Sequence, residues 1–174
     1  MLDGLVHTAV TTHTTIASPV GDLTVVATSG SVVGVYFPDH WSRPDRSAFG
    51  APTELGFDEV RNQLSEYFSG VRRAFDIRRH GEGDALQQKV WELIGQVPYG
   101  ETSTYGELAQ MVGDGTTPQA VGAAVGHNPL SILVPCHRIV GRNGKLTGYA
   151  GGLARKQFLL DLEAAAVGHP GRLF

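Results

Sequence analysis

Apolar, β-branched positions dominate the first part of the chain. Residues 23–28 and 32–37 are rich in valine, and residues 29–31 (Ser-Gly-Ser) between them are typical of a tight hairpin turn. Residues 74–77 form a shorter run that predicts a third strand. Residues 1–13, rich in threonine and histidine, carry no such pattern, and we expect them to be loosely ordered.

A loop and a helix complete this half of the chain. Residues 38–55 contain three prolines and one glycine, which predicts an irregular connection. Apolar side chains then recur at helical spacing before Gly70, at Phe57, Val60, Leu64, Tyr67 and Phe68. The pattern predicts a small α+β domain over residues 1–80, an antiparallel sheet with one helix.

The second half of the chain is helical. Residues 79–84 are polar and glycine-rich and predict a linker, so residues 84–174 form a second domain. Capping signals begin two short helices at Thr104 and Thr117, which together predict a helix-turn-helix. A last helix begins near Leu153. The first helix of this domain carries an apolar stripe at Leu86, Val90, Leu93 and Ile94.

The composition is that of a globular protein rather than of a general nucleic-acid binder. Hydrophobic residues make up 41% of the chain and charged residues 18%, which suits a packed core. The net charge is −3, and residues 84–174 hold seven basic and seven acidic residues. Most nucleic-acid-binding domains show a basic excess. DNA binding would therefore depend on helix N-termini, backbone amides and a few placed cations.

Composition also limits location and metal binding. The sequence has no apolar run long enough for a membrane span and no signal-peptide pattern, so we expect a cytoplasmic protein, and a monomer by default. A single cysteine excludes an intramolecular disulfide and a multi-cysteine zinc site. His7 and His13 could ligate a metal, but spaced histidines in a polar segment are usually solvated, so we expect no metal.

The clearest candidate for chemistry is Cys136, which follows a strand-like run at residues 132–134. Free cysteines are usually small buried core residues. His137 can act as a base, and together with Arg138 it would lower the pKa of the thiol toward the reactive range. Adjacent side chains on a strand point to opposite faces, so this pairing alone leaves the core and nucleophile interpretations both open.

Several motifs surround the cysteine. Gly-His-Asn-Pro occupies residues 126–129, Pro-Cys-His-Arg 135–138 and Gly-Tyr-Ala-Gly-Gly-Leu 148–153, with Pro-Tyr-Gly-Glu-Thr at 98–102 and Ser-Pro-Val-Gly-Asp-Leu at 18–23. Together they resemble the O6-alkylguanine-DNA alkyltransferase family, the methylated-DNA–protein-cysteine methyltransferases. The resemblance implies an N-terminal ribonuclease-H-like domain and a C-terminal helical domain of the winged helix-turn-helix type, which carries the cysteine.

The resemblance implies a role for each matching residue near the cysteine. Cys136 is the alkyl acceptor, activated through water by His137 and Glu163, while Asn128 braces the active-site turn. A histidine can remove the thiol proton, and a carboxylate can orient the imidazole and stabilise its charge. The sequence alone leaves open that Glu163 is a solvated residue late in a helix.

The resemblance also implies a guanine pocket. Tyr105 lies near the N3 atom and helps to protonate the leaving base, while Tyr149 and the backbone of Ala150 lie near O6. The carbonyl of Ile139 accepts from the exocyclic amine, and Gly151 leaves room for the alkyl group. Core packing with a satisfied hydroxyl remains the alternative for both tyrosines.

A base inside a duplex must be flipped out before its O6 substituent can meet a buried sulfur. The family places its recognition helix in the minor groove, which requires small side chains, and Ala120, Gly122 and Ala123 supply them. Close helix–helix packing would require the same stripe. Arg138 is a candidate DNA-binding cation. Gln119 stands where the family usually has arginine, which predicts weaker flipping or weaker DNA binding.

The sequence therefore predicts direct-reversal repair of double-stranded DNA. An alkyl group moves from O6-alkylguanine, and from O4-alkylthymine, irreversibly to Cys136, once per molecule and without a cofactor. The main alternative is a non-catalytic lesion-binding protein, which Gln119 keeps open. A thiol hydrolase that uses Cys136 and His137, and a redox-sensing transcription regulator, are further alternatives.

Overall fold

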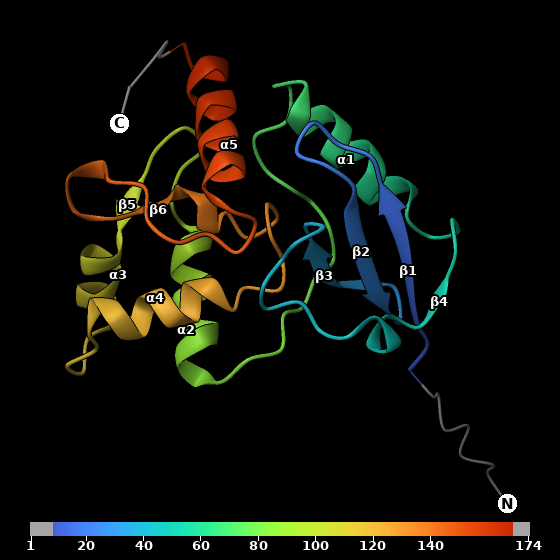
Figure 1. The fold of residues 1–174 in the computed structure, drawn as a ribbon, viewed down its shortest axis with the longest axis horizontal. Coiled ribbons are helices and arrows are strands. Elements are labelled where there is room, and N and C mark those ends of the chain that lie inside the picture. Colours follow the sequence, from blue (N-terminus) through green and yellow to red (C-terminus); the bar gives the residue numbers. More distant parts are fainter. Residues whose placement is uncertain (1–8, 169–174) are drawn as a thin grey trace, which may run out of the picture.

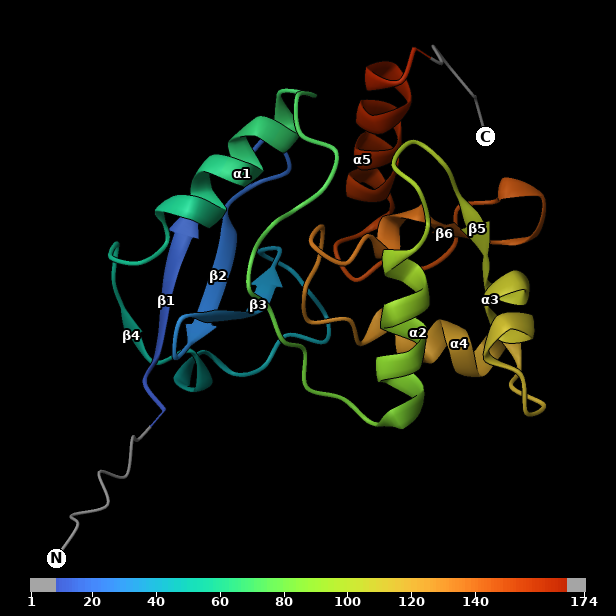
Figure 2. The same ribbon diagram turned by 180° about the vertical axis from the view of Figure 1, so that it is seen from behind.

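A computed structural model describes residues 9–168 of the chain. A four-stranded sheet with helix α1 forms one part, and helices α2 to α5 form the other, which lies beside it (Figures 1 and 2). The expected α+β fold, a sheet domain followed by a helical domain, is confirmed.

The sheet is mainly antiparallel. Strands β1 (Thr11–Ile16), β2 (Leu23–Thr28) and β3 (Ser31–Tyr36) form a meander, and β4 (Ala51–Pro52) pairs in parallel with β1, so the strand order is β3-β2-β1-β4. The hairpin turn before β3 contains two left-handed residues, Ser29 with φ 50° and Gly30 with φ 77°. This backbone matches the twist of the flanking strands.

Three expectations about this half were wrong. Residues 11–13, expected to be loosely ordered, belong to β1, because β-branched threonines pair with β2. Strand β4 lies inside the expected loop at 38–55, beside a short 3₁₀ helix, η1 (Arg46–Phe49). Residues 74–77 form no strand, because the side chain of Gln63 donates to the carbonyl of Asp76 and accepts from its amide.

Helix α1 (Asp58–Phe68) packs its apolar stripe against the sheet. Val60, Leu64 and Tyr67 are buried with strand residues in one core. The same core contains Leu130 and Leu159 from the second half of the chain. Burial of apolar surface therefore holds the sheet and the helical part together.

The helical part consists of α2 (Ala85–Gly95), α3 (Tyr105–Val112), α4 (Pro118–Gly126) and α5 (Leu153–Ala166). Capping boxes begin α2 at Asp84 and α3 at Thr104, and the Thr117 hydroxyl accepts from the Ala120 amide at 3.1 Å to cap α4. Two short parallel strands, β5 (Ser103–Thr104) and β6 (Ile139–Val140), pair beside α3. A second core, between α2, α3 and α4, contains Val90, Ile94, Leu108, Val121 and Ala124.

Within residues 9–168, no helix is long and apolar enough to cross a membrane. The same residues hold no group of three or more histidine, cysteine or acidic side chains that could bind a metal ion. His13 lies on β1 with its Nδ1 atom 3.1 Å from the carbonyl of Gly50. His7 lies outside the described residues.

His40 makes the fold sensitive to acid. Burial, with a smaller contribution from Arg43, lowers its pKa from 6.5 to about 4. The unfolded chain therefore binds a proton near pH 6.5, whereas the folded protein binds it only near pH 4. Stability is lost as the pH falls through this window. The contribution of His40 to the free energy of unfolding falls by about 3 kcal/mol between pH 7 and pH 4.

Substitution of His40→Phe tests this assignment, because a phenyl ring can occupy the same place between Tyr36 and Phe37. The measurement is the free energy of unfolding with urea at pH 7 and at pH 4. We expect its decrease between these pH values to be about 3 kcal/mol smaller in the variant than in the wild type. An equal loss in both proteins would contradict the assignment.

Candidate active site

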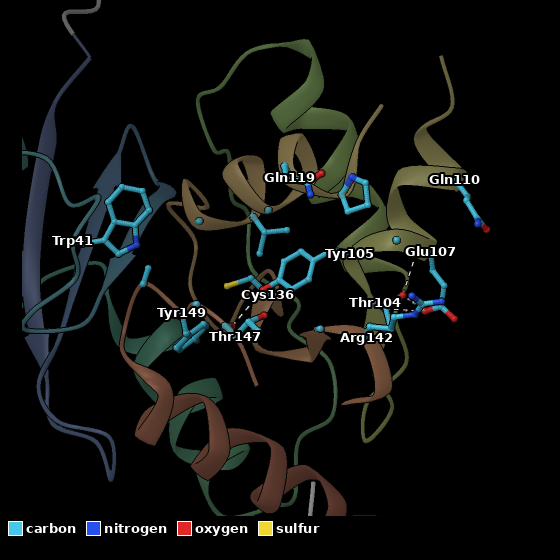
Figure 3. Close-up of a pocket in the computed structure, with 18 residues that line it drawn as sticks. Trp41, Thr104, Tyr105, Glu107, Gln110, Gln119, Cys136, Arg142, Thr147 and Tyr149 are labelled. Atoms are coloured by element: carbon cyan, nitrogen blue, oxygen red, sulfur yellow. Dashed lines mark hydrogen bonds between the residues drawn. The ribbon is translucent and has the colours of Figure 1, made fainter. Parts of the chain in front are cut away.

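One pocket, of about 930 Å³, opens beside α3 and α4 (Figure 3). Its size is within the range of small-molecule sites. Trp41 and Arg142 stand at opposite sides of it, and Cys136 lies between them (Figure 3). The expected site residues on its lining are Tyr105, Gln119, Gly122, Cys136, Tyr149 and Ala150.

A strained turn, rather than the expected strand at 132–134, leads into the cysteine. Ile132 is 1% exposed and has φ 72°, a left-handed conformation that β-branched residues rarely adopt. Asn128 braces the turn, because its side-chain nitrogen donates to the Val134 carbonyl at 2.9 Å and its oxygen accepts from the Leu130 amide at 3.0 Å. Burial and these bonds hold a conformation that local sequence disfavours.

Cys136 begins a short 3₁₀ helix, η2 (Cys136–Arg138), so the alternation of a strand does not apply to its neighbour. His137 is fully buried, and its Nε2 atom lies 2.7 Å from Oε1 of Glu163. Among the described residues, Nδ1 of His137 has no hydrogen-bond partner. The histidine therefore pairs with the carboxylate at one nitrogen and keeps the other for a further proton exchange.

The Glu163 carboxylate fixes the tautomer of His137. Burial opposes its charge, but hydrogen bonds from His137 and Arg138, together with the guanidinium charge of Arg138, lower its pKa to about 2. An ionised carboxylate can only accept, so we assign the imidazole hydrogen to Nε2 and an open lone pair to Nδ1. Burial lowers the pKa of His137 below 6.5, so the ring is neutral at pH 7.

The thiol of Cys136 is protonated at rest. The sequence suggested that His137 lowers its pKa, but burial raises the pKa above 9. The side chains of Asn128 and Tyr149 and the charge of Lys156 act in the opposite direction without reversing it. The thiol must therefore lose its proton when a substrate reaches it.

Lys156 of α5 places a buried cation beneath the pocket. Its Nζ atom donates to the carbonyls of Ile139 and Thr147 and lies over the rings of Tyr105 and Tyr149, at 5.8 and 5.9 Å from their centroids. Burial lowers its pKa to about 8. The cation thus favours the thiolate of Cys136 without contact with solvent.

The two pocket tyrosines remain protonated at neutral pH. Burial raises the pKa of Tyr105, whose hydroxyl donates to the Thr147 carbonyl at 3.5 Å. Burial raises the pKa of Tyr149 further, and its hydroxyl is buried without a hydrogen bond among the described residues. Both hydroxyls can therefore donate to a ligand.

Helix α4 presents small side chains beside the pocket. Gln119 and Ala123 are exposed, and Ala120 and Gly122 are partly exposed, whereas Val121 faces the core. The stripe is thus an accessible surface, and helix packing uses the opposite face.

Gly151, Ile139 and Arg138 are among the expected site residues that lie off the pocket lining. A Cβ at Gly151 would stand 2.4 Å from the Phe37 ring, so packing against this ring by itself requires glycine. The carbonyl of Ile139 already accepts from Lys156. Arg138, expected near DNA, is 7% exposed, because its guanidinium compensates the charge of the Glu163 carboxylate.

Sequence reasoning missed three residues that the structure brings to the site. Tyr67 was assigned to the apolar stripe of α1, yet its hydroxyl donates to Oε1 of Glu163 at 2.7 Å. Trp41 of the expected loop lines the pocket, with its ring 5.1 Å from that of His127. Lys156 precedes Glu163 by seven positions on the buried face of α5, a spacing that marks one helix face.

A buried thiol beside a histidine–glutamate pair and an exposed helix of a helix-turn-helix is typical of a DNA-binding domain that carries its own nucleophile. Comparison with known families agrees. Residues 85–165 match the 6-O-methylguanine DNA methyltransferase DNA binding domain, and residues 11–78 match the ribonuclease-like domain of the same protein. The chain belongs to the methylated-DNA–protein-cysteine methyltransferase family.

Individual relatives support this membership. A methylated-DNA–protein-cysteine methyltransferase of Mycobacterium bovis is 41% identical over 87% of this chain and 91% of its own length. One from Methanosarcina acetivorans is 45% identical over 74% of this chain and 76% of its own length. The Mycobacterium tuberculosis OGT in complex with DNA superposes with a TM-score of 0.82 at 40% identity, covering 88% of this chain and 93% of that one.

Removal of the carboxylate charge tests the role of Glu163 in the interior. Glu163→Gln leaves the buried guanidinium of Arg138 without a counter-charge, so we expect a loss of about 3 kcal/mol in the free energy of unfolding. Glu92→Gln is the matched control, because Glu92 forms an exposed ion pair with Lys89 at 3.3 Å. We expect this substitution to change the free energy of unfolding by less than about 1 kcal/mol. Equal effects in a urea titration would contradict the assignment.

Proposed function

We propose that this chain repairs alkylated DNA by direct reversal. It removes the alkyl group from O6-alkylguanine, and from O4-alkylthymine, in double-stranded DNA and keeps it on Cys136. One observation carries this proposal: the single cysteine lines the pocket beside α4, and the buried His137–Glu163 pair adjoins it in the chain. The sequence and structural relatives are methyltransferases of this kind by name.

The reaction is a displacement at the alkyl carbon. The thiol proton moves to Nδ1 of His137 through a bridging water molecule, and Glu163 stabilises the imidazolium that forms. The sulfur forms a bond to the carbon while the carbon–O6 bond breaks, and the electron pair of that bond leaves with guanine. A proton from Tyr105 at N3, or at O6, completes the base. Tyr105 then regains a proton from water in the pocket while His137 releases the thiol proton, so no net proton is gained or lost. The thioether product is not hydrolysed, so each molecule reacts once.

DNA docks through the small-residue face of α4. A duplex buries the O6 carbon in its stack, so the nucleotide flips out into the pocket. Ala120, Gly122 and Ala123 allow α4 to approach the minor groove closely, and Gln119 stands at the pocket edge (Figure 3). Arg142, exposed on the lining, provides a cation for the phosphate backbone. The side chains named above carry out this chemistry without a cofactor, and a monomeric, cytoplasmic protein remains our prediction.

Intact-protein mass spectrometry tests the transfer directly. After incubation with a duplex that carries one O6-methylguanine, we expect the wild type to gain the mass of one CH₂ group, with matching loss of the lesion. Cys136→Ala should gain nothing, because the acceptor sulfur is absent. Binding of the lesion without a mass change would indicate a lesion sensor instead. If the protein neither binds the lesion nor gains mass, a thiol hydrolase or a redox regulator would be favoured.

Gln119→Arg tests the effect of glutamine at the start of α4, where the family usually has arginine. Arginine adds a cation where the helix meets DNA, so we expect tighter duplex binding and a lower Kd by about tenfold at low salt. Gln96→Arg adds the same charge at the end of α2, away from the pocket lining, and controls for net charge. An equal gain in both variants, or none in either, would show that position 119 has no special role.

A further inference from the structure

Tyr67 reaches from the sheet domain into the catalytic cluster. It lies on α1, is fully buried, and places its hydroxyl 2.7 Å from Oε1 of Glu163 and 3.4 Å from Nε2 of His137. Tyr67 and Glu163 are 96 positions apart in the chain. An N-terminal helix thus contributes directly to the hydrogen-bond network behind the nucleophile.

The hydroxyl does more than fill space. The ring of Tyr67 already packs against Phe68, Phe75 and Tyr99, at centroid distances of 5.4, 5.4 and 6.1 Å. A phenylalanine would make the same ring contacts, and it would avoid burying a polar group. What tyrosine adds here is one hydrogen bond to the carboxylate. The neighbouring Tyr99 shows the contrast, because its buried hydroxyl has no partner among the described residues.

The direction of this hydrogen bond is determined. An ionised carboxylate only accepts, so Tyr67 donates. Burial, together with the negative charge of Glu163, raises the pKa of Tyr67 well above 10, which keeps the proton on the phenol. Oε1 of Glu163 therefore accepts from three donors, Tyr67, His137 and Arg138.

We propose that Tyr67 is a positioning residue for the alkyl transfer: its hydroxyl fixes the Glu163 carboxylate against His137 and moderates the pull of that carboxylate on the imidazole proton. This inference rests on the proposed function, because it assigns Tyr67 a role in the same proton relay. It gives the sheet domain a part in the chemistry beyond support of the fold.

The sign of the effect follows from charge sharing. Without the Tyr67 hydroxyl, the negative charge of Oε1 is shared among fewer donors and stabilises a protonated His137 more strongly. The pKa of His137 then rises, and the imidazole is neutral, and able to take the cysteine proton, only at higher pH. The charged and titratable groups that act on this ring are Glu163 and Lys156 of α5, Arg138 of η2 and Tyr67 of α1. Cys136 adjoins His137 in the chain, and Tyr149 interacts with Glu163 and Tyr67.

The test is the single-turnover rate of methyl transfer from an O6-methylguanine duplex between pH 5.5 and 8.5. For Tyr67→Phe we expect the acid limb to move upward by about half to one pH unit, with a rate about three- to tenfold lower at each pH on that limb. Tyr99→Phe is the matched control, because it removes an unpaired hydroxyl from the same cluster, and its profile should follow the wild type. A uniform rate loss at every pH, or coincident profiles, would overturn the proposal.

A second measurement does not depend on activity. Titration of the His137 ring followed by ¹⁵N NMR should show a hydrogen on Nε2 in the wild type and a higher pKa in Tyr67→Phe. An unchanged pKa would overturn the role of Tyr67. If Tyr67→Phe does not fold, a hydrogen on Nδ1 in the wild type would overturn it equally. A wild type that binds the lesion but transfers no methyl would refute the proposed function, while the NMR comparison would still decide the role of Tyr67.

Discussion

The buried carboxylate of Glu163 is the interaction on which the site depends. A charge in the interior is tolerated only when it is paired and hydrogen-bonded. Glu163 accepts five hydrogen bonds, from Tyr67, Gly100, His137 and twice from Arg138. These donors come from α1, from the segment after α2 and from η2, so one side chain of α5 joins three other parts of the molecule. Catalytic geometry and stability therefore share the same residue.

This arrangement keeps the reactive group inactive until a substrate arrives. Burial holds Cys136 as a thiol and His137 as a neutral imidazole, so neither carries an unpaired charge in the interior. Lys156 supplies a cation for the thiolate without exposing it to water. A buried, protonated thiol is also protected against oxidation, which suits a nucleophile that is used once.

Strain and packing around the pocket set its shape. The left-handed Ile132 turns the chain sharply before Cys136, and burial of its side chain in the shared core compensates the strain. On the sheet side, the Ser42 hydroxyl donates to the Gly126 carbonyl at 3.1 Å, which ties the segment of Trp41 to the end of α4. The sheet domain thus forms part of the pocket wall as well as of the core.

The sequence by itself determined the hairpin, the helices with the caps at Thr104 and Thr117, and the motif around Cys136. Each of these is encoded within a few neighbouring residues. Only the tertiary structure decided that Arg138 and Tyr67 bind Glu163, that Phe37 requires glycine at position 151, and that residues 132–134 form a turn. These outcomes depend on partners far apart in the chain, which share no local pattern, and on burial, which changes the charge that each group can hold.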